Sequence, residues 1–324
     1  MKTGRRFPVT PFLAVRFATA ATLTLITPIA CKDKDRSQGD RMNAAVAAKD
    51  SASAEASAKA LASASASASS GFAILDAEKK ADKEKPAIAL FQSSCDEGSQ
   101  LGCAGLGIAH LDGRGGLVRD YKKARELLTK SCDAGVPRAC SALGNMNCSG
   151  LGMPKDADKA AELNKKACDG KEYRGCDNLA DMYRLGADGF PKDVKHAVEL
   201  YTFACDGNYA QSCHSLALAY CEGSGVGMSK EKCAQLATRS CAGGDPVACR
   251  DLAVWSSRGT NGLPRDYVKM KSYLDMSCND TTVVGCGFYA AMYFDGKVGP
   301  IDRKKGFELA ERACASEDAE GCMF

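Results

Sequence analysis

From residue 76 onward, apolar, small and polar residues recur along the chain with a period of 36 or 37 residues. Each period contains a Leu or Tyr followed directly by a small residue, then a Gly, and then an Asp or Ser. A Gly supplies the positive φ that ends a helix, and an Asp or Ser side chain accepts from the free N–H groups that begin the next helix. The pattern therefore predicts six units, each made of a helix, a Gly-containing turn and a second helix.

The turn and cap positions are occupied in every unit. The turn glycines are Gly113, Gly150, Gly186, Gly223, Gly259 and Gly296. The capping residues are Asp120, Asp156, Asp193, Ser229, Asp266 and Asp302. Small residues on both helices, such as Gly107 and Ala124, are expected to let the two helices of a unit cross closely.

A pair of cysteines with the spacing C-x7-C stands at each joint between these units. The pairs are Cys95 with Cys103, Cys132 with Cys140, Cys168 with Cys176, Cys205 with Cys213, Cys241 with Cys249, Cys278 with Cys286 and Cys314 with Cys322. The six units start at the second Cys of the first six pairs, so each first helix is expected to begin there. Eight residues of continuous helix advance about 12 Å, whereas a disulfide needs Cα atoms within about 7 Å. If each pair is bonded, the chain must therefore turn within the seven residues between its cysteines.

The chain holds 18 cysteines and no C-x-x-C motif. A reduced cytosolic protein rarely carries so many cysteines, and structural zinc sites favour short C-x2–4-C spacings. The cysteine content therefore indicates disulfides formed in an oxidising compartment. Seven joint bonds are predicted from the seven identical spacings, with no metal site.

Within the repeat region, three further cysteines lie outside the joints. Cys221 and Cys233 stand at the end of the first helix and the start of the second helix of one unit, so an eighth bond is predicted there. Cys148 occupies the same position as Cys221, but its unit has Ala160 where a partner would be. We therefore expect Cys148 to be a free thiol, either reactive or inert and partly buried.

The N-terminal residues 1–31 read as an export signal. A basic stretch precedes the apolar residues 17–30, which are too few to span a bilayer. The sequence Ala30-Cys31 resembles a bacterial lipobox, in which the Cys is acylated, although Pro28 stands where an aliphatic residue is usual. The alternative is ordinary cleavage near Ala30, which would give a secreted protein. Residues 32–75 are charged and then Ala/Ser-rich, and this composition predicts a disordered tether. Weak helix is the alternative, because Ala is a good helix former.

Charge and histidine content bear on two classes of function, nucleic-acid binding and catalysis or metal binding by histidines. The net charge is +3, with 43 basic and 40 acidic residues, so no broad basic field for nucleic acid is present. The three histidines, His110, His196 and His214, fall at different positions of different units, which does not suggest a metal site or a catalytic triad. No cofactor is expected.

Residues 76–324 resemble the Sel-one-like repeat family, which is related to tetratricopeptide repeats. The resemblance is carried by runs such as LADMYRLGADGFPKDVKHAVELYTFAC (Leu179–Cys205), and the C-x7-C joints look like the cysteine-rich, β-lactamase-like branch of that family. It implies an all-α, right-handed superhelical solenoid of antiparallel helix pairs, cross-linked by disulfides and exported from a bacterium. Six helix pairs would be flanked by half-repeat ends.

The resemblance also implies a binding function: a periplasmic, outer-membrane or cell-surface lipoprotein that binds a protein or peptide on its concave face. By analogy with tetratricopeptide repeats, first-helix positions one, five, eight and nine after the Cys should face that groove. The positions include Ser141, Asn145, Asp177, Asp181, Arg184, His214, Arg250 and Arg258.

Two alternatives remain open. Some relatives in that branch have been called penicillin-binding proteins or β-lactamases, and serine enzymes of this type need S-x-x-K, S-D-N and K-T-G elements. Ser229–Lys232 fits S-x-x-K, but Ser229 reads as a helix cap; Lys2-Thr3-Gly4 lies in the export signal, and S-D-N is absent. No catalytic residue is therefore predicted. The other alternative is a purely structural spacer in the cell envelope.

Overall fold

The structure is a computed structural model that describes residues 57–70, 72, 81–186, 189–279 and 282–315. Within these residues every regular element is an α-helix, apart from an isolated β-bridge between Asn279 and Thr282. None of the helices in this part of the chain is both long and apolar enough to cross a membrane. The export signal, with Cys31, lies outside the described residues.

The helices follow one another as a regular series of short elements. They are α2 (Ala81–Asp96), α3 (Gln100–Asp112), α4 (Tyr121–Asp133), α5 (Pro137–Ser149), α6 (Ala157–Asp169), α7 (Tyr173–Leu185), α8 (Val194–Asp206), α9 (Ala210–Glu222), α10 (Lys230–Ala242), α11 (Pro246–Arg258), α12 (Tyr267–Ser277), α13 (Cys286–Phe294) and α14 (Arg303–Cys314).

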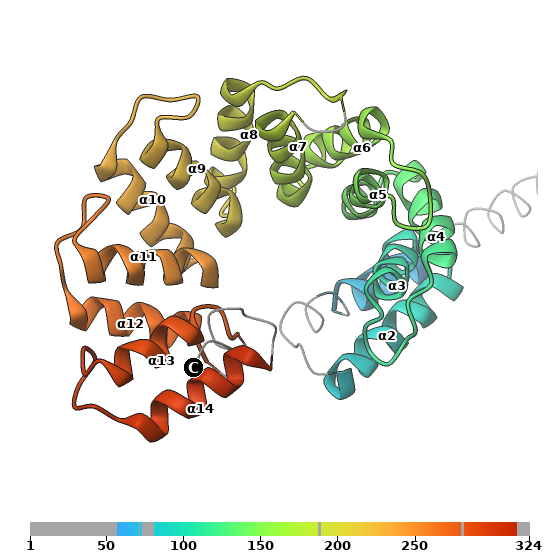
Figure 1. The fold of residues 1–324 in the computed structure, drawn as a ribbon. Helices are drawn as coiled ribbons and strands as arrows, with labels where there is room; N and C mark the ends of the chain where they lie inside the picture. Colours follow the sequence, from blue (N-terminus) through green and yellow to red (C-terminus); the bar gives the residue numbers. More distant parts are fainter. Residues whose placement is uncertain (1–56, 71, 73–80, 187–188, 280–281, 316–324) are drawn as a thin grey trace, which may run out of the picture. The chain divides into compact units, whose positions relative to one another are not determined.

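Consecutive helices pack as antiparallel neighbours, and each pair stacks on the next (Figure 1). The pairs are α3/α4, α5/α6, α7/α8, α9/α10, α11/α12 and α13/α14, as the sequence predicted. First helices also contact one another across pairs, α5 touching both α3 and α7. We call α3, α5, α7, α9, α11 and α13 the first-helix layer. The expected all-α solenoid of antiparallel helix pairs is confirmed.

The local signals in the sequence act as expected at the helix ends. All six turn glycines adopt the left-handed conformation, with φ between +63° and +73°. The capping side chains accept from backbone N–H groups of the following helix, as Asp120 does from Lys123 N at 2.9 Å and Ser229 from Lys232 N at 3.3 Å. Each helix pair is thus delimited by residues within its own repeat.

Six described joints bring their two cysteines together, with Cα atoms 4.5 to 5.0 Å apart. The bonded pairs are Cys95 with Cys103, Cys132 with Cys140, Cys168 with Cys176, Cys205 with Cys213, Cys241 with Cys249 and Cys278 with Cys286. In five of them the chain reverses through a residue with positive φ, three positions after the first Cys: Gly98, Gly135, Lys171, Asn208 or Gly244. The solenoid is therefore cross-linked by disulfides between successive repeats. Cys322, the expected partner of Cys314, lies outside the described residues.

Most first helices begin earlier than the sequence reasoning expected. A start at the second joint Cys is wrong for Cys103, Cys140, Cys176, Cys213 and Cys249, because α3, α5, α7, α9 and α11 each begin three residues before that Cys. Only α13, among the described first helices, begins at its Cys. The available signals for the earlier start were Ser99, which caps α3, and a Pro at the first position of α5 and α11.

The earlier start places the second Cys of these joints within the first turn of a helix rather than before it. The sulfur atoms of Cys103, Cys140, Cys213 and Cys249 lie 3.5 to 3.8 Å from the carbonyl oxygen of the Cys to which each is bonded. A disulfide sulfur carries no hydrogen, so these are close contacts and not hydrogen bonds. All four residues are buried, so they belong to the core of the solenoid and offer no surface to a ligand.

The three remaining cysteines of the repeats separate into a pair and a single residue. A disulfide joins Cys221 at the end of α9 to Cys233 near the start of α10, with the Cα atoms 5.2 Å apart. Cys148, at the end of α5, is half-buried and forms no disulfide within the described residues. Ala160 occupies the position on α6 that corresponds to Cys233.

The structure differs from the expected tether in one respect: residues 57–70 are helical, and Ala64 and Ala68 are buried. Phe72 lies against α2, its ring centroid 4.7 Å from that of Phe91. Alanine has the highest intrinsic helix propensity, so an Ala-rich segment needs only a modest apolar contact to become helical. Part of the segment expected to be disordered therefore covers the core of the first repeats.

Small residues set the spacing between the two helices of a pair. A Cβ atom on Gly107 would lie 2.9 Å from Cγ of Leu128, and a Cβ atom on Gly144 would lie 2.9 Å from the side-chain amide atoms of Asn164. Leu128 and Asn164 occupy the same repeat position, four residues before the joint Cys. The same helix spacing thus holds an apolar side chain, Leu128, in one repeat and an amide side chain, Asn164, in the next.

Candidate binding surface on the first-helix layer

Hydrogen bonds between polar side chains link successive first helices. Asn178 of α7 donates to Ser141 Oγ of α5 at 3.4 Å, and Ser212 of α9 donates to Asp177 Oδ1 of α7 at 2.6 Å. Their partners are 37 and 35 residues apart, which is one repeat. The first position after the joint Cys is therefore used to connect one repeat to its neighbour.

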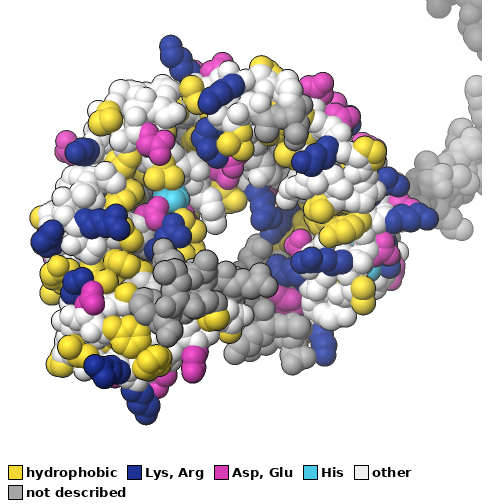
Figure 2. All heavy atoms as spheres, in the orientation of Figure 1, with side chains coloured by type: hydrophobic (Ala, Val, Ile, Leu, Met, Phe, Trp, Pro, Cys, Tyr) yellow, Lys and Arg dark blue, Asp and Glu magenta, His cyan; other side chains and the backbone are white. Residues whose placement is uncertain are grey.

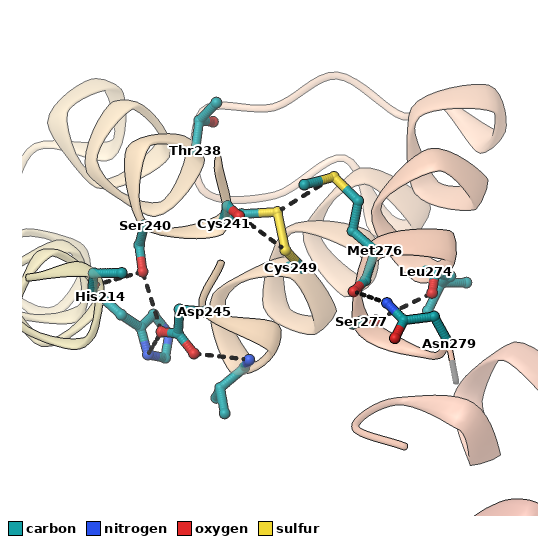
Figure 3. The surroundings of a disulfide bond; sticks show 12 residues. His214, Thr238, Ser240, Cys241, Asp245, Cys249, Leu274, Met276, Ser277 and Asn279 are labelled. Carbon is teal, nitrogen blue, oxygen red and sulfur yellow. Dashed lines mark hydrogen bonds and ion pairs between the residues drawn. A yellow bond between two sulfur atoms is a disulfide. The ribbon is translucent and has the colours of Figure 1, made fainter. Parts of the chain in front are cut away.

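His214 of α9 forms the next connection, and Figure 3 shows its ring beside Asp245, the residue that caps α11. The Nε2 of His214 lies 3.0 Å from Asp251 Oδ2, and its Nδ1 lies 3.7 Å from Oδ2 of Asp245. Ser240 Oγ is 3.1 Å from the same Asp245 oxygen. Burial alone would raise the pKa of Asp251, but hydrogen bonds from His214 and Arg250 bring it below its ordinary value.

Asp181, Arg184 and Tyr201 form a second polar cluster. The Tyr201 hydroxyl donates to Asp181 Oδ1 at 2.5 Å, and the Arg184 guanidinium donates to the same oxygen at 2.9 Å. Burial and the hydrogen bond to the Asp181 carboxylate raise the pKa of Tyr201 above its ordinary value. Asp181 and Arg184 remain close to half exposed, so the pair offers both charges to a partner.

Asp177 of α7 bonds to Ser212 and is also affected by the charge of Asp181. Burial raises the pKa of its carboxyl to about 6, a hydrogen bond from Ser212 works in the opposite direction, and the negative charge of Asp181 adds to the rise. The group therefore changes charge in a mildly acidic range, unlike an ordinary surface aspartate.

The residues proposed for the groove do not share one environment. Ser141 and His214 are buried and take part in the contacts between repeats, and Arg250 bonds to Asp251. Asn145 and Arg258 are exposed. Among the described residues, Asn145, Asp181 and Arg184 thus come together near the surface of α5 and α7, whereas His214 serves chiefly to connect repeats.

Two pockets open beside these residues. A pocket of about 240 Å³ lies between α5, α6 and α7 and is lined by Asn145, Cys148, Asn164 and Asp181, among others. A pocket of about 150 Å³ lies between α7, α8 and α9 and includes Arg184 and Tyr201. Both are smaller than the 300–1,000 Å³ typical of drug-sized ligands, which suits single side chains or residues.

Asn164 and Tyr201 were not singled out by the sequence reasoning. They stand at a repeat position that holds Leu128, Ala237 and Leu274 in other repeats. A polar residue at a position that is otherwise apolar was the available signal, and its meaning depends on the pocket that only the folded chain forms.

Basic and acidic side chains are interspersed over the face seen in Figure 2, without a continuous field of one sign. Among the described residues, no group of three or more His, Cys, Asp or Glu side chains is arranged to hold a metal ion. The surface is therefore varied in charge from one repeat to the next.

Stacked helix pairs, contacts between first helices and disulfide joints define a helical-repeat solenoid. The Sel1 repeat matches residues 75–99, 100–136, 137–171, 174–209, 210–245, 246–278 and 284–318. The chain therefore belongs to the Sel1 repeat family. The match at 75–99 covers the segment that ends with α2, which the sequence reasoning described as a half-repeat; the other six correspond to the six predicted units.

Solved structures agree on the fold. The chain is similar to a Sel1 repeat protein from Oxalobacter formigenes, with a TM-score of 0.63 and 21% identity, over 77% of this chain and 99% of that one. It is also similar to c5321, a protective antigen present in uropathogenic Escherichia coli strains, with a TM-score of 0.55 and 23% identity, over 80% of this chain and 55% of that one. The chain thus spans about half the length of c5321. No curated protein matches the chain in sequence.

The raised pKa of Asp177 gives a prediction for stability. The native state holds this proton more tightly than the unfolded state, whose pKa is near 3.8. The resulting stabilisation is complete below that value and is lost as pH rises through about 6. Asp177→Asn, which keeps an acceptor for Ser212, should therefore raise the free energy of unfolding at pH 7 by about 1 to 3 kcal/mol.

Urea unfolding between pH 4 and pH 7 measures this effect. The wild type should lose stability relative to Asp177→Asn over that range, while Glu126→Gln, at an exposed position of α4, should follow the wild type. A constant difference between wild type and Asp177→Asn at all pH values would contradict the assignment.

Proposed function

We propose that the chain is an exported repeat scaffold that binds a protein or peptide at the surface of its first-helix layer, the face expected to be concave. Sel1 repeats are typical of proteins that act through protein–protein contacts. The observation that supports a binding role for this chain is the pair of neighbouring pockets on α7, one beside Asp181 and the other beside Arg184.

The chemistry of these pockets suits a peptide. Leu185, 56% exposed, offers apolar contact at one pocket, and the Asp181–Arg184 pair supplies both an acceptor and a donor between the two. A peptide that crosses α7 could place one side chain in each pocket while its backbone bonds to this pair. Binding of that kind gains affinity from preformed pockets rather than from a large flat area.

The hydrolase alternative receives less support. The hydroxyl of Ser229 accepts from the backbone N–H of Lys232 at 3.3 Å, so it caps α10. Cys176, in the Cys176-Asp177-Asn178 sequence that resembles S-D-N, is bonded to Cys168. Lys2-Thr3-Gly4 lies outside the described residues. A scaffold function accounts for Ser229 and Cys176 through their structural contacts alone.

A charge reversal on α7 tests the binding surface. Asp181→Lys combined with Arg184→Glu should weaken binding of the partner about tenfold or more, because the order of donor and acceptor is inverted while an ion pair is kept. The partner is first identified by cross-linking the mature chain in envelope extracts, and its Kd is then measured by calorimetry.

The matched control is the pair Lys159 and Glu162 on α6, which has the same i,i+3 spacing and whose side chains are 47% and 70% exposed. Lys159→Glu combined with Glu162→Lys should leave the Kd unchanged. Equal affinity of the α7 variant and the wild type would exclude this surface as the binding site.

We also propose that residues 1–31 direct export and that Cys31 carries a lipid anchor. The disulfide joints support an oxidising destination, and the small residue before Cys31 supports acylation. Cys31→Ser should then move the protein from the membrane fraction to the soluble fraction of a bacterial host, whereas Cys148→Ser should not. A wild-type chain that is soluble and begins near residue 31 without added lipid mass would show the anchor to be wrong.

A further inference from the structure

The larger pocket on the first-helix layer contains a thiol that the cross-links do not use. Cys148 is half-buried at the end of α5, contacts the apolar cluster around Met182, and lines the pocket of about 240 Å³. Cys221, at the same position two repeats later, is bonded to Cys233. Within the described residues, Cys148 therefore has a free thiol at this repeat position, and the thiol lines a pocket.

Asn164 supplies an independent indication of a ligand. The residue is 1% exposed and lines the same pocket. Its Oδ1 accepts from Asn178 Nδ2 at 3.3 Å, but its Nδ2 donates to no described residue. Because Asn164 lines the pocket, this amide donor is available for a hydrogen bond to an acceptor on whatever occupies it.

The groups around the thiol complement a peptide. The Nδ2 of Asn164 can donate to a carbonyl, and the Oδ1 of Asn178, which accepts from no described residue, can accept from an N–H. Met182 and Leu185 provide an apolar wall. A cysteine residue within a peptide carries a C=O and an N–H within a few bonds of its sulfur. A peptide that contains an oxidised cysteine therefore offers both the sulfur and the amide groups that this pocket can bind.

We propose that this pocket captures disulfide-bearing peptides by thiol–disulfide exchange at Cys148. The Cys148 thiol first loses its proton to solvent, and the thiolate attacks one sulfur of the peptide disulfide. A new S–S bond forms to Cys148, the S–S bond of the peptide breaks, and the departing sulfur leaves as a thiolate that takes up a proton from solvent. The disulfide of the peptide is the oxidant, so no other redox partner is required.

This capture goes beyond non-covalent binding of a protein partner and does not depend on it, because a small disulfide is sufficient to test it. Asn164 fixes the orientation of the peptide and acts as a positioning residue, whereas the thiol of Cys148 is the reacting group. Selectivity for amide-bearing disulfides should therefore depend on Asn164, and adduct formation itself on Cys148.

The fold provides a matched variant for Asn164. Leu128 occupies the same position in the preceding repeat and lies as close to Gly107 as Asn164 lies to Gly144. Asn164→Leu should therefore fold, as judged by circular dichroism and thermal unfolding, while losing the amide donor.

The experiment uses the mature chain with its disulfides intact and two neutral probes. One is the disulfide of N-acetylcysteinamide, which carries amides on both sides of its sulfur; the other is 2-hydroxyethyl disulfide, which carries none. Intact mass and peptide mapping should show one adduct, on Cys148, for the wild type and none for Cys148→Ser. The ratio of the rates with the two probes should fall about tenfold or more in Asn164→Leu.

The wild type gives a second readout that needs no variant at Asn164. If the pocket binds the peptide before exchange, the rate of adduct formation should saturate with the concentration of the N-acetylcysteinamide disulfide. A rate that rises linearly for both probes, or a rate ratio that is equal in wild type and Asn164→Leu, would show an ordinary accessible thiol and overturn the proposal. Alkylation of Cys148 by iodoacetamide without any adduct from either disulfide would also overturn it.

Discussion

Two cysteines eight residues apart can bond only where the chain reverses between them, and this constraint recurs at every described joint of the solenoid. Each bond fixes the end of a second helix to the start of the next first helix, with Cα atoms no more than 5.0 Å apart. A bond that closes a loop of about nine residues contributes roughly 2.6 kcal/mol in the chain-entropy description. Because each repeat of a solenoid contacts only its neighbours, cross-links between neighbours stabilise the contacts on which the fold depends.

The proposed binding surface depends on the same joints. Each joint brings the first turns of a first helix beside the preceding first helix. The bonds from Asn178 to Ser141, from Ser212 to Asp177 and between His214 and Asp251 therefore connect successive repeats. With these helices held in contact, polar residues at apolar positions, Asn164 and Tyr201, line pockets between them.

Much of the fold could be predicted because its signals are local and repeated. Turn glycines, capping aspartates and cysteine spacing each act within one repeat, and the Cys221–Cys233 bond follows from the geometry of a single hairpin. The starts of most first helices were predicted three residues too late, since the cysteine spacing marks the cross-link and not the cap. Weak helix in the Ala-rich segment was an open alternative because of its alanines, and residues 57–70 are helical. The contact between Phe72 and Phe91 was not foreseen, because the local pattern does not encode it. For the groove, the sequence could not indicate which side chains connect repeats. His214, expected to face a groove, is buried and lies against the carboxylates of Asp245 and Asp251 in the next repeat.

The disulfide joints are tested most directly by peptide mapping of the mature chain under non-reducing conditions, with free thiols alkylated in denaturant before digestion. Cross-linked peptides are expected for all seven joint pairs, including Cys314 with Cys322, and for Cys221 with Cys233. Alkylation should be confined to Cys148 when Cys31 is acylated or removed. Alkylation of most joint cysteines without reductant would contradict the account, because the repeats would then be held together by packing alone.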